Sequence, residues 1–466
     1  MWDHLVIGGG ISGLSAAHEA RFRGESVSIL EASPRAGGVI QTLELDDPQT
    51  GHHFLLETGP HTFAASAHRL IELAHQVGLT PQAVSAVAKK RYVAKNGRLH
   101  AVPMDPLSFL TTPLLSLAGK AYLLGEPFRA PIATAPDDPS VSSWITHRLG
   151  GDVLDWLVAP FLSGIYAGDP EHLGARSIFA SLLDWEDSQG SLAKGAFDAL
   201  KKKRKTMSRS AKSASSTQLL GFPQGMQTFI DALVKELPSH TLNVNTKVDR
   251  IEKSGQGYKV WLDSGESRSG TSLSIAVPAP EAARLLSPML PEASLLTEIP
   301  YAPVALLHVA VPNHLLRQPL DGFGFLVPHQ EKTPLLGCIW ASALFSTRST
   351  SRSFADQATP SRSSQALLSC FVGGMRNRET LSWTDAELMT AIKPALARYH
   401  GVVNDNAFQL LKVIRWPSAI PQYIPGHRSR MRALVSTMAD QLPNLTLRGN
   451  YGFGIALHAC LEPMAL

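Results

Sequence analysis

A glycine-rich turn near the beginning of the chain constrains its fold more than any other feature. Residues 5–7 (LVI) predict a short buried strand, the motif G-x-G-x-x-G over 8–13 follows at once, and the alanine-rich residues 14–23 suit a helix. Residues 27–30 predict a second strand, which ends at Glu31. A strand, a glycine turn, a helix and a second strand in this order indicate a βαβ unit of an α/β fold.

Each part of this motif has a physical task in binding a dinucleotide. Gly8 permits the tight turn, Gly10 lets a pyrophosphate approach the backbone, and Gly13 allows the helix to pack closely on the strand. The free N–H groups at the start of the helix can bind phosphates. The Glu31 carboxylate can accept hydrogen bonds from an adenosine ribose, and its charge disfavours a 2′-phosphate. With all these parts in place, the sequence predicts a dinucleotide-binding site.

The composition excludes several classes of protein. The chain has 466 residues, enough for two or three domains of ~150 residues each. Its net charge, 43 − 39 = +4, is too small to indicate nucleic-acid binding. The three cysteines (Cys338, Cys370 and Cys460) are far apart in sequence, which excludes a disulfide scaffold or Cys-rich metal site and fits a reducing compartment. The 17 histidines show no H-E-x-x-H or similar spacing, so we expect no metal.

The rest of the chain predicts helices first and a second sheet afterwards. We expect residues 92–200 to be mostly helical and the basic run over 201–205 to be a solvated loop. From Leu445 the pattern predicts a strand, a glycine turn over 449–454 and a helix beginning at Ile455. Seven strand-like runs lie between residues 205 and 445, and the last four of them suit a second sheet. The runs are 241–251, 258–262, 273–277, 303–310, 323–327, 335–340 and 367–372.

The segment 101–130 is a long apolar stretch, but prolines and charges interrupt it, and the chain has no window of ~18 uncharged apolar residues. This segment is either a pair of core helices or an apolar surface that rests on a bilayer or leads to an apolar pocket. The first ten residues predict a strand rather than an apolar leader, so we expect no secretion.

Two stretches after the glycine motif resemble the FAD-containing amine oxidase superfamily. Residues 31–38 (EASPRAGG) place an arginine and paired glycines just beyond the acidic residue, and residues 57–63 read ETGPHTF. In that superfamily the arginine and the glycines lie along the cofactor. Further stretches, spread over essentially the whole chain, resemble the oxygen-dependent protoporphyrinogen oxidase family: 90–92 (KRY), 97–103 (GRLHAVP), 163–170 (SGIYAGDP), 221–226 (GFPQGM), 322–328 (GFGFLVP), 371–374 (FVGG) and 415–427 (RWPSAIPQYIPGH).

This resemblance implies an α/β fold with three domains. A discontinuous Rossmann-type FAD-binding domain would comprise residues 1–88, 218–284 and 428–466. A mostly helical, membrane-facing domain, through which the substrate enters, would comprise 89–205, and a basic, serine-rich loop would follow over 206–217. An α+β substrate-binding domain would comprise 285–427.

The resemblance also implies an activity. Members of the family oxidise protoporphyrinogen IX to protoporphyrin IX in three two-electron steps, with molecular oxygen reoxidising the FAD and hydrogen peroxide as the product. The cofactor does the difficult chemistry and no acid–base pair stands out in the sequence, so we assign no catalytic side chain. We expect a cytoplasmic protein, and leave open a homodimer and peripheral contact with the inner face of the cell membrane. Coproporphyrinogen III is an alternative substrate, and a flavin-binding protein without turnover is an alternative of another class.

By the same resemblance, a set of residues is expected at the FAD. It comprises the first glycine turn, the acidic strand end, the arginine and its glycines, one later strand residue and the last turn, whose amides would face the pyrimidine edge of the flavin. The residues are Gly8, Gly10, Ile11, Ser12, Gly13, Glu31, Ala32, Arg35, Gly37, Gly38, Val248, Gly454, Ile455 and Ala456.

Six residues are expected at the substrate by the same resemblance. An arginine matching Arg91 binds a propionate, and an aromatic residue matching Phe371 stacks on a ring of the macrocycle. Apolar residues matching Leu326 and Ile339 enclose another ring, and the small Ala167 and Gly168 leave room for it. The alternative for Arg91 is a surface charge at the start of a strand. For Leu326, Ile339 and Phe371 the alternative is a purely structural role in a core.

Overall fold

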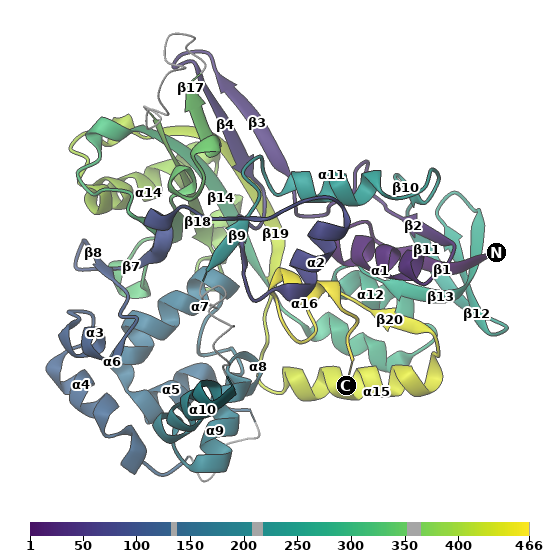
Figure 1. The fold of residues 1–466 in the computed structure, drawn as a ribbon, viewed down its shortest axis with the longest axis horizontal. Helices are drawn as coiled ribbons and strands as arrows, with labels where there is room; N and C mark the ends of the chain where they lie inside the picture. Colours follow the sequence, from purple (N-terminus) through teal and green to yellow (C-terminus); the bar gives the residue numbers. More distant parts are fainter. Residues whose placement is uncertain (132–137, 207–217, 352–364, 466) are drawn as a thin grey trace.

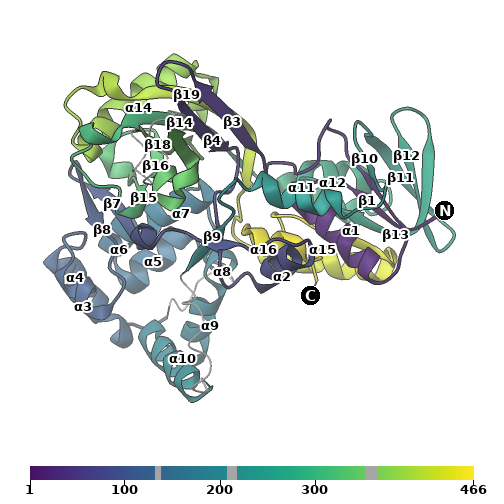
Figure 2. The same cartoon turned by 45° about the horizontal axis from the view of Figure 1, so that its top comes forward.

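The chain folds into two large sheets and a cluster of helices, as the ribbon shows (Figure 1). The structure is a computed structural model that describes residues 1–131, 138–206, 218–351 and 365–465. The loop predicted over 206–217 lies outside the described residues except for Thr206. In both views the first sheet and the helices on it lie toward the N-terminus, and the second sheet and the cluster of helices between residues 106 and 206 lie at the other end of the molecule (Figure 2).

The first sheet confirms the βαβ start predicted from the glycine motif. Its strand order is β10-β2-β1-β13-β12-β11, with β20 also beside β13. The pairs of β1 with β2 and β13, of β10 with β2 and of β20 with β13 are parallel, whereas β11, β12 and β13 form an antiparallel meander. The strands are β1 (Trp2–Ile7), β2 (Val27–Leu30), β10 (Leu242–Asn243), β11 (Val248–Ser254), β12 (Gly257–Leu262), β13 (Ser267–Ile275) and β20 (Leu445–Leu447).

Helices cover both faces of this sheet, because successive residues of a strand point to opposite faces. Val6 packs in one core with α1, α2, α11 and α16, and Leu5 and Ile7 pack in another with α12 and α15. α1 begins at Ile11, three residues before the predicted start, which places Ser12 and Gly13 in its first turn. The helices are α1 (Ile11–Phe22), α2 (His68–Gln76), α11 (Gln227–Lys235), α12 (Ala279–Leu286), α15 (His427–Gln441) and α16 (Leu457–Leu461).

The second sheet contains the four apolar runs predicted for it, in the strand order β19-β14-β18-β16-β15-β7-β8. One face packs against α14, in a core that includes Leu307, Phe325 and Leu396. The elements are β7 (Lys90–Lys95), β8 (Arg98–Ala101), β14 (Tyr301–Pro312), β15 (Gly322–Leu326), β16 (Leu335–Ile339), β18 (Gln365–Gly373), β19 (Gln409–Pro421), α13 (Ala341–Leu344) and α14 (Asp385–His400).

Two small sheets connect these parts. β4 pairs with β3 and β17, and β9 pairs with β5 and β6. Their bounds are β3 (Thr42–Asp47), β4 (His52–Glu57), β17 (Ser349–Ser351), β5 (Phe63–Ala64), β6 (Gln82–Ala83) and β9 (Leu219–Gly221).

The helical part packs around Trp144 and Leu162. Arg148 is fully buried there and pairs with the carboxylates of Glu126 and Glu186. Among the described residues, no helix is long and apolar enough to cross a membrane. The helices are α3 (Pro106–Thr111), α4 (Leu117–Leu124), α5 (Val141–Leu149), α6 (Gly151–Val153), α7 (Ala159–Tyr166), α8 (Ala175–Ile178), α9 (Ala180–Gln189) and α10 (Leu192–Thr206).

Three sequence expectations differ from the structure. The basic run 201–205 is helical, because α10 continues to Thr206. Residues 92–101 belong to β7 and β8 of the second sheet rather than to a helix, because β7 pairs in parallel with β15. α12 crosses the predicted domain boundary at 284/285, and the chain as far as Ile299 packs in the core of the first sheet.

Candidate cofactor and substrate site

The glycine turn between β1 and α1 has the geometry that a bound pyrophosphate needs. Gly8 has φ +101°, and a Cβ there would lie 2.4 Å from the carbonyl oxygen of Ala276. A Cβ on Gly13 would lie 1.8 Å from the carbonyl oxygen of Gly8. A Cβ on Gly10 would meet no atom within 4 Å, so the space in front of the turn is open. Two glycines are thus required by packing, and the third faces a vacant approach to the backbone.

Glu31 lies against the same turn. The N–H of Gly9 donates to Oε2 of Glu31 (2.5 Å), and the backbone N–H and hydroxyl of Ser33 donate to Oε1 (2.7 and 2.5 Å). Oε1 thus accepts two hydrogen bonds and Oε2 accepts one, so Oε2 can also bind a ribose hydroxyl. Ala32 is exposed beside it.

The stretch from Arg35 to Gly38 folds back onto the turn. The N–H of Gly37 donates to the carbonyl of Gly9 (2.8 Å), and a Cβ on Gly38 would lie 3.5 Å from Cα of Gly10. The Arg35 guanidinium donates to the carbonyls of Ala36, Gly38 and Ile40, which fixes this loop in place. The structure therefore brings the arginine and the paired glycines to the pyrophosphate side of the first sheet.

The remaining residues predicted at FAD come from two distant segments. Val248 is buried at the start of β11, and its carbonyl accepts a hydrogen bond from Arg284 (2.8 Å). Gly454, Ile455 and Ala456 lie between β20 and α16, and α16 packs on α1.

This last segment is also anchored to α1 by polar contacts. The Ser15 hydroxyl donates to the carbonyl of Leu461 (3.1 Å), and Arg448 pairs with Glu19 (2.5 Å). Ile455 also packs against the core of the helical part, so the segment lies where the cofactor-binding part meets the helices. The role of these residues toward FAD stays a prediction.

Leu326, Ile339 and Phe371 lie on one face of the second sheet. Leu326 pairs with Gly337, and Gly337 pairs with Phe371, so Leu326, Gly337 and Phe371 form a row across β15, β16 and β18. Ile339 is two residues beyond Gly337 and points the same way. A Cβ on Gly337 would lie 2.8 Å from the carbonyl oxygen of Phe325 and 3.3 Å from Cδ2 of Leu326, so glycine lets Leu326 pack closely here. The free thiols of Cys338 and Cys370 lie on the opposite face, with their sulfur atoms 3.8 Å apart.

Arg91 lies at the edge of this face. It pairs with Gly324 in β15, and its guanidinium lies over the Phe323 ring at 5.8 Å. Phe323 and Ile339 pack in the same small cluster. Arg91 is half-buried, and burial lowers its pKa. Within the described part of the chain its guanidinium has no ion-pair partner, so it can bind an anion without breaking an existing pair.

Ala167 and Gly168 close the side of this face toward the helices. Ala167 ends α7 with φ +48°, and its carbonyl accepts a hydrogen bond from the N–H of Met375 (2.8 Å). It packs with Phe371 and Leu336. A Cβ on Gly168 would lie 2.6 Å from Oε1 of Gln422, so a larger residue would not fit there.

A group of buried polar residues beside Phe371 was not predicted from the sequence. His61 lies 6.1 Å from the Phe371 ring and is hydrogen-bonded through Ser369 to His308. Behind them, Glu57 and Arg348 form a fully buried ion pair (2.7 Å). Burial raises the pKa of the Glu57 carboxyl, and the Arg348 guanidinium opposes that rise. His61 stands in the stretch 57–63, but its partners are 308 and 247 positions away, so no local pattern could identify them.

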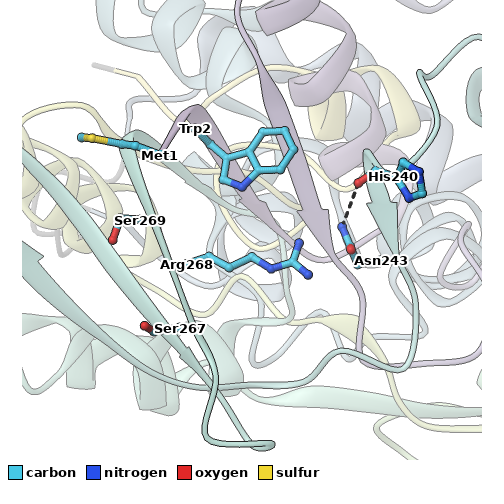
Figure 3. A pocket seen from close by; sticks show the side chains of 7 residues that line it. All are labelled: Met1, Trp2, His240, Asn243, Ser267, Arg268 and Ser269. Carbon is cyan, nitrogen blue, oxygen red and sulfur yellow. Dashed lines mark hydrogen bonds between the residues drawn. The ribbon is translucent and has the colours of Figure 1, made fainter.

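A surface hollow of 810 Å³ lies elsewhere, where β1 and β13 begin (Figure 3). Trp2, His240, Asn243 and Arg268 line it, and Arg268 donates to the Ser28 hydroxyl (2.9 Å). Ligands of open α/β sheets bind at the carboxyl ends of the parallel strands, whereas β1 enters the sheet at this hollow. The hollow is therefore not the cofactor site. In the part of the chain that the structure describes, no cluster of three His, Cys, Asp or Glu residues could hold a metal ion.

Comparison with known proteins agrees with this geometry. The family described as flavin containing amine oxidoreductase matches residues 11–462. A chloroplastic protoporphyrinogen oxidase of Nicotiana tabacum is 31% identical over 99% of this chain and 83% of its own length. A coproporphyrinogen III oxidase of Bacillus subtilis is 28% identical over 98% of this chain and 95% of its own.

The solved structures agree on the fold. A cyclohexylamine oxidase from Brevibacterium oxydans matches with a TM-score of 0.68 and 18% identity, over 99% of this chain and 96% of that one. A protein from Exiguobacterium, described provisionally as a protoporphyrinogen oxidase, matches with a TM-score of 0.74 and 23% identity, over 98% and 96%. The predicted flavin cofactor and the predicted α/β fold class are confirmed, whereas the membrane-facing role of the helical part stays a prediction.

Proposed function

Because the chain belongs to the flavin-containing amine oxidoreductase family, we propose that it is an FAD-dependent oxidase of a porphyrinogen, which it converts to the porphyrin with molecular oxygen. The observation that carries this proposal is Arg91, a half-buried arginine without a carboxylate partner among the described residues, beside the apolar face of Leu326, Ile339 and Phe371. A porphyrinogen is a large apolar ring with carboxylates on its edge, and this arrangement has the matching chemistry. The names of the two relatives above support the same substrate class.

The residues of the first sheet would hold the FAD, and the residues of the second sheet would orient the ring. Bound there, FAD would supply the two-electron redox chemistry of the reaction. Gly8, Gly10 and Gly13 give the pyrophosphate its approach to the backbone, and Glu31 can bind the ribose. Phe371 offers a ring face for stacking, and Arg91 offers a bidentate partner for a propionate.

Between the two porphyrinogens, the charges near the face favour protoporphyrinogen IX. This substrate has two carboxylates, whereas coproporphyrinogen III has four and needs more cationic partners. Arg376 lies close to the face, but it already pairs with Asp169 (2.8 Å), the residue after Gly168. Coproporphyrinogen III remains the second candidate because the Bacillus subtilis relative is named for it.

We also propose that the helical part rests on a membrane surface from which an apolar substrate is taken. Of the two alternatives for segment 101–130, the exposure of its side chains favours the apolar surface. Leu114 and Leu115 between α3 and α4 are buried, but four large apolar side chains in these helices and just after them are exposed: Leu107 (69%), Leu117 (84%), Leu124 (65%) and Phe128 (91%). Exposed apolar residues concentrated on neighbouring short helices are typical of peripheral contact with a bilayer. On this basis we expect a cytoplasmic enzyme at the inner face of the membrane.

The proposal is tested by the stoichiometry of the reaction. Purified, flavin-loaded protein is mixed with protoporphyrinogen IX or coproporphyrinogen III in air-saturated buffer, and oxygen consumption, peroxide and porphyrin fluorescence are followed together. We expect three molecules of oxygen consumed and three of peroxide formed per porphyrin, with the higher kcat/KM on protoporphyrinogen IX. Flavin-loaded protein that accelerates neither oxidation above the rate of free FAD would contradict the proposal.

A further inference from the structure

A buried chain of three side chains joins the substrate face to the interior behind it. Nδ1 of His61 lies 3.2 Å from the carbonyl oxygen of Gly59, and its Nε2 lies 3.0 Å from the Ser369 hydroxyl. The same hydroxyl lies 3.1 Å from Nδ1 of His308, and Nε2 of His308 lies 2.9 Å from the carbonyl oxygen of Glu57. All three side chains are buried.

When both imidazoles are neutral, these three side chains have one proton fewer than their hydrogen bonds require. The chain contains four hydrogen bonds, and both of its ends are carbonyl oxygens, which only accept. A neutral His61, a neutral His308 and the Ser369 hydroxyl bring one proton each, so three protons serve four bonds. Each imidazole donates its N–H to one of the two carbonyls. The Ser369 hydroxyl then lies between two ring nitrogens that can only accept, and its single proton can serve only one of them. A fourth proton would complete all four bonds.

The surroundings keep that proton away in the resting protein. The pKa of His61 is lowered to about 3 and that of His308 to about 4, mainly by burial and in part by the Arg348 guanidinium. Glu57 faces the chain only through its backbone carbonyl, because its carboxylate pairs with Arg348. Lys412, opposite His308 in β19, is exposed.

His400 shows that this shortage is not a general property of buried histidines in the protein. Its Nδ1–H donates to the carbonyl of Leu396 (2.9 Å), and its Nε2 accepts from Nε1–H of Trp340 (3.1 Å). Two protons serve two bonds there, and nothing is missing. Burial also lowers the pKa of His400 to about 4, so the two sites differ in their hydrogen bonds rather than in their burial.

The position of the chain connects it to both halves of the site. His61 lies 6.1 Å from the Phe371 ring on the substrate face. Gly59, two residues before His61, packs closely on Val39, because a Cβ on Gly59 would lie 2.6 Å from the carbonyl oxygen of Val39. Val39 directly follows Gly38 in the loop that is predicted to contact FAD. His61 therefore stands between the loop predicted to contact FAD and the residue predicted to stack on the ring.

We propose that His61, Ser369 and His308 form a relay that accepts one proton in each two-electron step and returns it when oxygen is reduced. The inference rests on the proposed function, because it needs a substrate that loses hydrogen. Each step removes two electrons and two protons; one proton leaves with the electron pair, and the relay holds the other. Reduction of oxygen to hydrogen peroxide takes up two electrons and two protons, so the relay gives its proton back. Between the two events the extra electron pair leaves one negative charge in the site, which favours an imidazolium nearby.

The test uses flavin-loaded protein without any porphyrinogen, so its outcome does not depend on the identity of the substrate. Histidine-ring ¹⁵N NMR is recorded at pH 7.5 with the flavin oxidised and after anaerobic photoreduction. We expect one imidazolium to appear at His61 or His308 on reduction, while His400 stays neutral as the control in the same spectra. If both histidines stay neutral after reduction, the relay is refuted.

A variant gives an independent measurement. In His61→Gln the side-chain amide nitrogen can take the position of the imidazole Nε2 and donate to Ser369, which completes the hydrogen bonds without an extra proton. Proton uptake on photoreduction is measured in weakly buffered solution with a pH indicator. Wild-type protein should take up one proton more per flavin than His61→Gln. Equal uptake in two proteins that carry the same amount of flavin would overturn the proposal, and Ser369→Ala, which removes the bridge between the histidines, should behave as His61→Gln does.

Discussion

Replacing Arg91 with alanine should weaken the reaction with a porphyrinogen mainly through KM. A guanidinium paired with a propionate holds the ground state and the transition state alike, so its loss is a loss of uniform binding. Charge-assisted hydrogen bonds are worth about 1.5–3 kcal/mol, and Arg91 is half-buried, so water replaces the propionate interaction only in part. At ~1.4 kcal/mol per tenfold, kcat/KM should fall by roughly ten- to 150-fold. Arg91→Lys should recover only part of this, because an ammonium cannot make the bidentate contact.

The fold should tolerate this substitution, because Arg91 has no ion-pair partner in the described chain that would be left uncompensated. Alanine at this position removes the cation–π interaction with the Phe323 ring at 5.8 Å, worth about 0.5–1 kcal/mol. The assay is steady-state oxidation of both porphyrinogens at saturating oxygen, with flavin content and melting temperature measured for each variant. Arg98→Ala, at an exposed arginine in the neighbouring strand β8, is the matched control and should leave kcat/KM unchanged. An Arg91→Ala enzyme with wild-type kcat/KM on its preferred substrate would remove Arg91 from the site.

Three further predictions follow from the packing and charges of the structure. Gly13→Ala should yield protein without stoichiometric flavin, because its Cβ would lie 1.8 Å from the Gly8 carbonyl oxygen. Glu31→Ala should weaken the binding of FAD by about 1–3 kcal/mol. Flavin absorbance measures the first effect, and a titration of apoprotein with FAD measures the second. Arg348→Met should destabilise the fold by about 3–5 kcal/mol by leaving Glu57 buried without its partner. Burial raises the pKa of Glu57, so the folded state binds the proton more tightly than the unfolded state, and the loss in urea unfolding should be smaller at pH 5 than at pH 8. Replacing the exposed Leu107, Leu110 and Leu117 with serine should reduce flotation with anionic lipid vesicles and leave bound flavin unchanged. The control Val403→Ser, at a residue that is 85% exposed in a loop after α14, should have no effect on flotation. Flotation that is the same for all these proteins would favour a role of segment 101–130 unrelated to membranes.

The sequence predicted the cofactor half of the protein because the signals there are local. Gly8, Gly10, Gly13 and Glu31 lie within 24 consecutive residues, and packing requires glycine at Gly8 and Gly13. The apolar runs of the second sheet were equally clear, since β14, β16 and β18 are buried. These parts of the fold could be predicted without knowing which strands pair.

The parts that were missed depend on contacts between distant residues. β7 carries Lys90, Arg91 and Lys95 at its ends, so its sequence does not show the apolar pattern of a buried strand although its centre is buried. Its partner β15 lies more than 200 positions later. The residues 285–299 were assigned to the wrong side of a boundary because their leucines suit either core. His61, Ser369 and His308 come from three segments that only the second sheet and the loop after β4 bring together. No periodicity of the sequence contains that information.

If this chain transfers electrons from a porphyrinogen to its own bound flavin, the transfer can be observed by mixing the two without oxygen. Flavin-loaded protein and one equivalent of protoporphyrinogen IX are mixed anaerobically, and the flavin absorbance near 450 nm is followed together with porphyrin fluorescence. We expect rapid loss of the flavin absorbance, which returns when air is admitted, and complete formation of porphyrin only then. The same course should be slower in Arg91→Ala. Flavin that keeps its absorbance in the presence of both protoporphyrinogen IX and coproporphyrinogen III, while dithionite still reduces it, would show that the protein does not oxidise a porphyrinogen.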